Sequence, residues 1–447
     1  MSKRMINTTA ARRGLVLLGL LAVLGAATTA LAAPEIMSTY GDQLTWHSAS
    51  INAMGGTGTA IYRGGISNIY NPAFLAVETS NRFDLGFSLD QETEDRFQPL
   101  FDSFENYVNR AAIASNRQHY WDTGFSYAGR ILKQQFPMTV AISLTDRYAF
   151  GYIFEEELRS PYIHNDPTQR DQILEDRLYE VSGTLRDLSL GLGFDISEGY
   201  SVGAAFHYAF GSRNVSKSVR DTNIPVGGDD ESYNNQSDFD LSGVHWTVGF
   251  RGKISERVEF GVAWESQLSA TGNFAFNNYS ATPDTTIMSN YDGYYRYPNS
   301  YRAGLTFRPR TDPRTTFSLE LEYKPWSEMA DSQNSGYDNP QNLSDVTDVR
   351  VGLEHLFYNG MPIRFGFRYI DTYADREVSS SVFSAGVGIP FQKGMFSVSL
   401  ELSKLSAIQE HIFGYPGDYL GEAYETDPQA IVEDTRFRLG VGYKQDF

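Results

Sequence analysis

The stretch Ser48–Val77 reads S-A-S-I-N-A-M-G-G-T-G-T-A-I-Y-R-G-G-I-S-N-I-Y-N-P-A-F-L-A-V. It is rich in small residues and follows neither a helical nor a strand period. Gly55, Gly56 and Gly58 tolerate backbone dihedrals that residues with a side chain resist. Asn71-Pro72 predicts a turn, because proline fixes its own φ and biases the preceding residue away from the helical region. Such a segment cannot form a hydrophobic core alone, so we expect it to fold against a wall formed by the rest of the chain.

The first 32 residues have the pattern of a secretory signal peptide. A basic beginning is followed by the short apolar run Gly14–Ala27, and Ala30-Leu31-Ala32 supplies the small residues of a cleavage site. We therefore expect cleavage near Ala32/Ala33 and a mature protein that leaves the cytoplasm.

The composition excludes several classes of protein. The 447 residues carry a formal net charge of −18, which argues against nucleic acid as a partner. The chain has no cysteine, so disulfides and thiol chemistry are excluded. Beyond the leader, no run reaches the roughly 20 apolar residues that a membrane-spanning helix needs. A membrane location would therefore require strands, for which the 28 tyrosines, 29 phenylalanines and 40 glycines are suitable.

From Asn81 onward, apolar and polar residues alternate in segments separated by turns. This pattern predicts fourteen strands, at 81–90, 118–129, 136–148, 184–197, 200–212, 239–253, 257–269, 299–309, 314–326, 346–357, 362–371, 379–390, 394–405 and 434–447. Short turns alternate with longer polar loops. An even number of strands with short turns on one side and long loops on the other is typical of an outer-membrane barrel.

The alternation also indicates which face meets lipid. In 363–369, Phe365 and Phe367 share one face, and Arg364 and Arg368 share the other with Gly366. Lipid cannot solvate a charge, so the apolar face should point outward. A soluble sandwich also alternates, but it rarely places arginine and glycine together on the solvent face of strand after strand.

The sequence therefore predicts an all-β protein: a 14-stranded antiparallel transmembrane β-barrel with an N-terminal plug, or hatch, in the lumen. The expected organisation is a signal peptide at 1–32, the plug at 33–80 and the barrel at 81–447. Many strands carry a glycine at similar depth on the inward face. These glycines either relieve strain in curved strands or clear room for the plug, and the two explanations are compatible.

The loop 91–117 contains an apolar stripe at helical spacing that includes Leu100, Phe101, Phe104 and Val108. We expect a helix here, with Pro99 suited to its first turn. The helix would be either a lid packed on the barrel rim or an apolar landing surface for a hydrophobic ligand.

Inward-facing arginines gather in the C-terminal half, and the candidates for binding a ligand carboxylate are Arg302, Arg350, Arg364 and Arg368. Inward glutamates could pair with them in an ion-pair lattice, which is the simpler explanation, since unpaired lumen charges are costly. Some of the arginines could instead present a guanidinium to a ligand carboxylate.

Other motifs do not indicate chemistry. Gly55-Gly56-Thr57-Gly58 lacks the third glycine of a dinucleotide fingerprint and any G-K-[ST] of a phosphate loop. No nucleophile elbow or zinc-protease motif is present. His207 and His245 share the inward face of neighbouring strands, and we expect hydrogen-bonded lining residues rather than catalytic groups or metal ligands. We therefore expect no catalytic residues, no metal and no cofactor.

Two blocks resemble the FadL-like family of outer-membrane transport proteins. They are Ala53-Met54-Gly55-Gly56-Thr57-Gly58-Thr59-Ala60 and Ile69-Tyr70-Asn71-Pro72-Ala73-Phe74-Leu75. In that family an N-terminal hatch lies inside a fourteen-stranded barrel, and Asn71, Pro72 and Ala73 match the turn at the end of the hatch. The resemblance implies that this turn gates the barrel, with Gly55, Gly56 and Gly58 in the same hatch.

The resemblance also implies a function. We expect a transporter for the uptake of hydrophobic compounds, such as long-chain fatty acids or aromatic molecules, by passive diffusion after hatch movement. The expected partners are a hydrophobic ligand and outer-membrane lipid, the expected state is a monomer, and the expected location is the outer membrane of a Gram-negative bacterium. A related branch with a similar plug suggests an alternative, a non-transporting barrel subunit of a protein secretion or outer-membrane assembly system. A hydrolase built on the same barrel is a third hypothesis, and the absence of catalytic motifs argues against it.

Overall fold

The computed structural model describes residues 35–43, 48–101, 104, 107–132, 137–159, 172–222, 230–333, 342–413 and 429–447. The expected signal peptide, 1–32, lies outside the described residues. Within them, no helix is long and apolar enough to cross a membrane.

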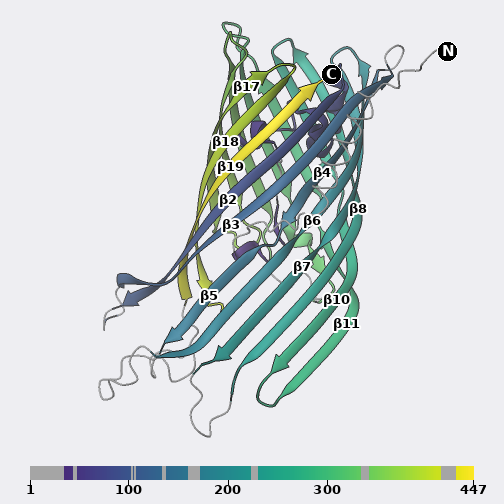
Figure 1. Ribbon diagram of the computed structural model, residues 1–447. Coiled ribbons are helices and arrows are strands. Elements are labelled where there is room, and N and C mark those ends of the chain that lie inside the picture. The colour runs from purple at the N-terminus through teal and green to yellow at the C-terminus, as the bar shows by residue number, and fades with distance from the viewer. Residues whose placement is uncertain are drawn as a thin grey trace, which may run out of the picture.

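The described strands form one closed antiparallel barrel (Figure 1). The first half of the wall consists of β2 (Arg82–Phe101), β3 (Tyr107–Leu132), β4 (Met138–Ala149), β5 (Tyr152–Arg159), β6 (Ile173–Ser197), β7 (Tyr200–Asp221) and β8 (Tyr233–Ser255). The second half consists of β9 (Val258–Glu265), β10 (Leu268–Ser280), β11 (Thr285–Tyr297), β12 (Ser300–Phe307), β13 (Thr315–Lys324), β14 (Ala330–Asp331), β15 (Val346–Leu356), β16 (Pro362–Asp371), β17 (Ser379–Phe391), β18 (Gly394–Glu410) and β19 (Gln429–Asp446).

Four of the barrel strands are interrupted, so that β4 with β5, β9 with β10, β11 with β12 and β13 with β14 each make one pass. With these pairs joined, the described wall has the predicted fourteen strands. The barrel closes where β19 pairs with β2, from Ile431 opposite Phe97 to Asp446 opposite Arg82. The C-terminus therefore returns to the end of the barrel that carries the short turns (Figure 1).

The two faces of the wall agree with the predicted alternation. Along β13, Phe317, Leu319 and Leu321 are exposed, whereas Glu320 and Glu322 are buried. Phe365 is likewise exposed, and Arg364 and Arg368 are buried. Because apolar side chains cover the outer surface at this level, the barrel presents a lipid-facing belt, and its charges lie in the lumen.

Several strands are much longer than the sequence predicted, because they continue beyond the lipid-facing belt. β2 and β3 extend through most of the expected loop 91–117, and β6, β7 and β8 extend into the expected loops beside them. A transmembrane strand needs only about 9–11 residues. Beyond the belt, toward the long loops, the outer face is no longer apolar, so the hydrophobic period of two that reveals a strand is lost.

The predicted helix in 91–117 is wrong. Leu100 and Phe101 lie in β2, Val108 lies in β3, and Phe104 lies between the two strands. The side chains of Phe104 and Val108 are exposed. The helical spacing of the apolar residues did not decide the structure, because backbone pairing between β2 and β3, with two register shifts, continues to the end of the hairpin.

The lipid-facing belt leads to a first prediction. Phe365→Arg puts a charge on the outward face, so we expect unfolding from lipid vesicles to become easier by about 2–4 kcal/mol if the residue lies near the bilayer centre. Glu198→Arg, in the exposed turn between β6 and β7, should change stability by less than about 1 kcal/mol. Denaturant titration in vesicles measures both, and equal effects would contradict the assigned outer face.

Candidate functional site: the lumen and the N-terminal segment

The N-terminal segment, residues 35–43 and 48–80, lies against the inward faces of the strands (Figure 1). It contains η1 (Glu35–Met37), β1 (Asp42–Gln43), α2 (Ala49–Asn52), η2 (Gly64–Ile66), α3 (Ser67–Tyr70) and η3 (Pro72–Val77). α2 contacts β17, β18 and β19, and η3 contacts β6, β7 and β8 on the other side. Met54, Asn71 and Ala73 are completely buried, so the segment packs against opposite walls of the barrel at once.

The turn Asn71-Pro72-Ala73 is fixed by the two hydrogen-bonding ends of the Asn71 side chain. Asn71 Oδ1 accepts from the backbone N–H of Ala73 at 3.1 Å and caps η3, in which proline occupies the first position. Asn71 Nδ2 donates to the carbonyl of Thr59 at 2.9 Å and to the carbonyl of Phe250 at 3.1 Å. The same side chain therefore shapes the turn and ties it to β8.

Glycines of the wall make room for this segment. An added Cβ at Gly203 would overlap with the backbone of Pro72, one at Gly249 would overlap with the Asn71 side chain, and one at Gly261 would overlap with the carbonyl of Thr59. Gly191, Gly352, Gly366 and Gly386 also face this segment closely. These contacts support the explanation that the glycines clear room, whatever they add to strand curvature.

The glycines of the segment itself have different reasons. Gly55 and Gly56 have φ of +66° and +81°, a backbone conformation that favours glycine, in the turn that follows α2. Gly58 has a Tyr70 carbon 2.5 Å from the position where its Cβ would stand. The N–H of Gly55 donates to Ser384 Oγ at 3.1 Å.

Glu320 of β13 binds the backbone of the segment directly. Its Oε2 accepts from the N–H groups of Gly58 at 2.8 Å and Thr59 at 2.7 Å, while Oε1 accepts from Arg350 Nη1 at 2.8 Å. Two successive N–H groups around one carboxylate form an anion-binding nest. A buried wall carboxylate therefore holds the segment and is itself held by an arginine.

All four candidate arginines have carboxylate partners. Arg302 pairs with Glu265, Arg350 with Glu320, Glu322 and Asp348, Arg364 with Glu354, and Arg368 with Glu401. Arg302 also donates to the carbonyl of Ile69 at 2.9 Å. These pairs form the ion-pair lattice that the sequence suggested as the simpler explanation. The bond from Arg302 to Ile69 connects this lattice to the N-terminal segment.

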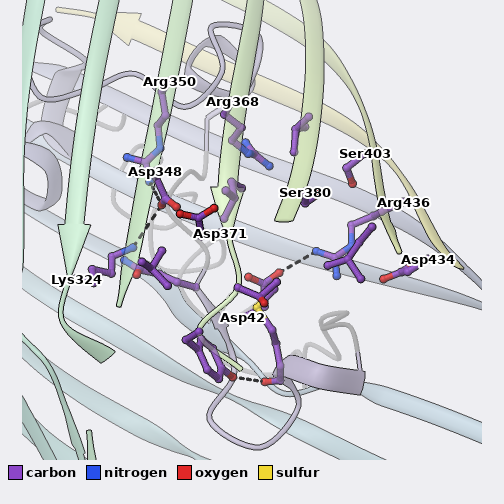
Figure 2. A pocket seen from close by; sticks show the side chains of 18 of the residues that line it. Asp42, Lys324, Asp348, Arg350, Arg368, Asp371, Ser380, Ser403, Asp434 and Arg436 are labelled. Atoms are coloured by element: carbon purple, nitrogen blue, oxygen red, sulfur yellow. Dashed lines mark hydrogen bonds and ion pairs between the residues drawn. The ribbon is translucent and has the colours of Figure 1, made fainter. Parts of the chain in front are cut away.

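A cavity of about 80 Å³ lies between this lattice and the N-terminal segment (Figure 2). Met37, Trp326 and Tyr373 contribute apolar surface to its lining. Val346, Ile370, Val382 and Leu405 add to this apolar surface. Charged and polar side chains line the rest, and across it Asp42 Oδ2 accepts from Arg436 Nη1 at 2.9 Å. The cavity is therefore amphiphilic, and part of its lining belongs to the N-terminal segment.

Next to the cavity, toward the long loops, aromatic side chains form a buried cluster in the lumen. Tyr148 stacks on Tyr297 with ring centroids 4.3 Å apart, and Trp326 stacks on Tyr373 at 4.0 Å. Further members are Tyr40, Phe150, Phe154, Phe239, Phe274 and Tyr295. Tyr40 reaches this aromatic cluster from the N-terminal segment and donates to Asp331.

Sequence reasoning missed this cluster because most of its members fall in segments expected to be loops. The signal that was available is the period of two in Tyr148, Phe150, Tyr152 and Phe154, whose side chains are all buried.

The wall is interrupted beside the aromatic cluster. β3 pairs with β4 only from Phe125 to Leu132, and in the described residues the rest of β3 pairs with β2 alone. The end of β4 pairs instead with β1 of the N-terminal segment, and β5 pairs with β6. β3 and β5 therefore have facing edges without a described ladder between them, and they diverge toward the long-loop end (Figure 1).

His207 and His245 meet in the lumen, as their shared face predicted. Their rings stack with centroids 4.4 Å apart and planes 13° apart. His207 contacts Ser189 Oγ at 2.7 Å and Thr247 Oγ1 at 2.9 Å, and His245 Nε2 lies 3.1 Å from Asp187 Oδ2. Asp187 and the two histidines are close enough to be considered as metal ligands. The lone pairs lie in nearly parallel ring planes, however, so they do not converge on one ion in this arrangement.

The geometry defines a class of protein: an antiparallel β-barrel with an apolar outer belt and an N-terminal segment inside it. The chain belongs to the BamG family, whose model matches residues 14–405. Sequence comparison with curated proteins finds no match.

Solved structures show the same fold. A FadL homologue of Pseudomonas aeruginosa is similar over 91% of this chain and 100% of that one, with a TM-score of 0.61 and 14% identity. The toluene transporter TodX of Pseudomonas putida is similar over 92% of this chain and 100% of its own, with a TM-score of 0.59 and 13% identity. The toluene transporter TbuX of Ralstonia pickettii is similar over 90% of this chain and 99% of its own, with a TM-score of 0.57 and 15% identity. The FadL-like resemblance seen in the sequence is thus confirmed for the fold.

Proposed function

We propose that this barrel takes up hydrophobic compounds across the outer membrane. The observation that carries the proposal is the aromatic cluster, which lies in the lumen next to an amphiphilic cavity and an interrupted wall. Aromatic side chains offer large apolar contact surfaces to a hydrophobic ligand. The description of TodX and TbuX as toluene transporters supports the same ligand class.

In the proposed path, the ligand enters from the long-loop end and binds among the aromatic side chains. A shift of the N-terminal segment, hinged at Asn71-Pro72-Ala73, then opens the way onward. The ligand leaves between β3 and β4–β5, or toward the short-turn end. Removal of the signal peptide near Ala32/Ala33 would deliver the mature chain as a monomer to the outer membrane of a Gram-negative bacterium.

The lumen charges favour uncharged ligands over fatty acids. A ligand carboxylate at Arg302, Arg350, Arg364 or Arg368 would have to displace a carboxylate of the protein. Breaking a buried ion pair is costly, about 3–5 kcal/mol when one partner is lost. A neutral aromatic or aliphatic compound avoids that cost, so we propose such compounds as the preferred cargo.

A reversible lock tests the mechanism. Cβ atoms at Gly442 and Ala49 would lie 3.6 Å apart, within the range of a disulfide, and no atom lies nearer than 3.4 Å to the added Cβ. The chain has no cysteine of its own, so the double variant Ala49→Cys/Gly442→Cys forms a single defined bond between α2 and β19. We expect the oxidised barrel in vesicles to lose most of its toluene flux and to regain it on reduction.

Each single cysteine variant is the matched control and should transport equally with and without reductant. Flux that is equal in the locked and the reduced barrel would rule out movement of the N-terminal segment. The absence of flux in both forms and in wild type would rule out transport itself.

A second candidate is a non-transporting barrel subunit of a protein secretion or outer-membrane assembly system. The observation that favours it is the number of bonds between the N-terminal segment and the wall, from Glu320, Arg302 and Asn71 among others. If this candidate is right, the barrel should purify in mild detergent as a stoichiometric complex, and the lock should leave that complex intact.

A further inference from the structure

The outer surface of the barrel carries a hollow of about 910 Å³ over β8, β9, β12 and β13. Two neighbouring rows of outward side chains form most of it. Val262, Ala303 and Leu321 are register partners in one row, and Trp264, Tyr301 and Tyr323 are register partners in the next. All of these side chains lie on the lipid-facing side of the wall.

One position in the middle of the hollow carries a very small side chain. Ala303 has a single methyl group, whereas Tyr301 and Leu305 on the same face of β12 are large. Its register partners Val262 and Leu321 are held on hydrogen-bonded strands, so they cannot close over it. The hollow is therefore a preformed depression in a rigid wall.

The depth of the hollow is fixed by the aromatic row. β9, β11 and β13 end close to this row, on its long-loop side, at Glu265, Tyr297 and Lys324. Tyr323 donates its hydroxyl to Asp345 at 2.7 Å, in a polar segment beyond the belt. Aromatic residues with a polar end mark the membrane interface. The row of Ala303 thus lies just inside the hydrocarbon region, on the side of the long loops.

We propose that this hollow binds one acyl chain of a lipid from the outer leaflet of the surrounding bilayer. The lining is almost wholly apolar, so the occupant is apolar. The hollow opens to the hydrocarbon region of the bilayer, where the surrounding molecules are lipid acyl chains. The lipid headgroup would lie beyond Tyr301, at the level of Asp345.

Filling the hollow tests the proposal. The barrel is placed in nanodiscs of dioleoylphosphatidylethanolamine, released into mild detergent and examined by native mass spectrometry. We expect wild type to retain one lipid and Ala303→Phe to retain it at least tenfold less often. Leu305→Phe adds an aromatic ring on the same face of the same strand but outside the hollow, so it should retain lipid like wild type. Ala303→Gly, which deepens the hollow, should also retain it.

Equal retention in all variants overturns the proposal, and so does equal loss in both phenylalanine variants. Retention of a second polypeptide in place of lipid overturns it too and would make the hollow a protein interface. Should Ala303→Phe fail to insert, Ala303→Leu makes the same comparison with less added bulk. None of these outcomes depends on transport through the lumen.

Discussion

Replacement of Glu320 with alanine is expected to release the N-terminal segment from the wall. The change leaves the N–H groups of Gly58 and Thr59 without their carboxylate and removes one partner of the buried Arg350. Loss of one partner of a buried ion pair costs about 3–5 kcal/mol. Because about 1.4 kcal/mol is a tenfold change in an equilibrium, local opening should become roughly a hundred to several thousand times more frequent. Hydrogen exchange of the amides in 55–62 measures it.

Glu401→Ala is the matched control for this experiment. Glu401 is also buried and pairs with Arg368 and Arg438, but its described hydrogen bonds do not reach the N-terminal segment. It should therefore leave the amides of 55–62 protected. Glu320→Gln keeps an oxygen acceptor without the charge and should fall between wild type and alanine. Equal exchange in Glu320→Ala and Glu401→Ala would show that Glu320 does not hold the segment.

A methyl group at Gly203 is expected to dislodge the turn at Asn71-Pro72-Ala73. The added Cβ would overlap with the carbonyl carbon of Pro72 and the N of Ala73, which are backbone atoms and cannot rotate away. Overpacking of this kind costs about 1–3 kcal/mol or more. We therefore expect Gly203→Ala to raise single-channel ion conductance in planar bilayers, because a dislodged segment leaves part of the lumen open.

Gly442→Ala supplies the comparison. It also faces the lumen beside the N-terminal segment, but the nearest atom to its added Cβ is 3.4 Å away, an ordinary contact. Its conductance should match that of wild type. An unchanged conductance in Gly203→Ala would mean that the turn does not limit passage through the barrel.

Much of the architecture could be predicted from local patterns. A period of two with apolar residues on one face identified every transmembrane pass, since lipid contact requires that pattern along each strand separately. Asn71-Pro72-Ala73 could be predicted as a turn because proline restricts its own residue and its neighbour. The same local reasoning failed for Leu100, Phe101, Phe104 and Val108, where a helical spacing occurs in a hairpin whose strands are fixed by their pairing.

The lumen was less predictable. That the arginines face inward followed from the alternation, but their partners did not. Asp42 meets Arg436 across 394 positions of the chain, and Gly58 meets Glu320 across 262. Such contacts depend on the shear and closure of the whole barrel, which a single strand does not encode.

By itself, the sequence determined the number of membrane passes, the outward face of each and the presence of a glycine-rich segment too small to fold alone. Only the tertiary structure decided the length of the strands beyond the belt, the aromatic cluster, the interruption between β3 and β5, and which carboxylate each lumen arginine meets. The physical reason is the separation along the chain over which each effect acts. Exposure to lipid constrains each outward-facing residue separately, whereas pairing inside a closed barrel joins residues that are hundreds of positions apart in the sequence.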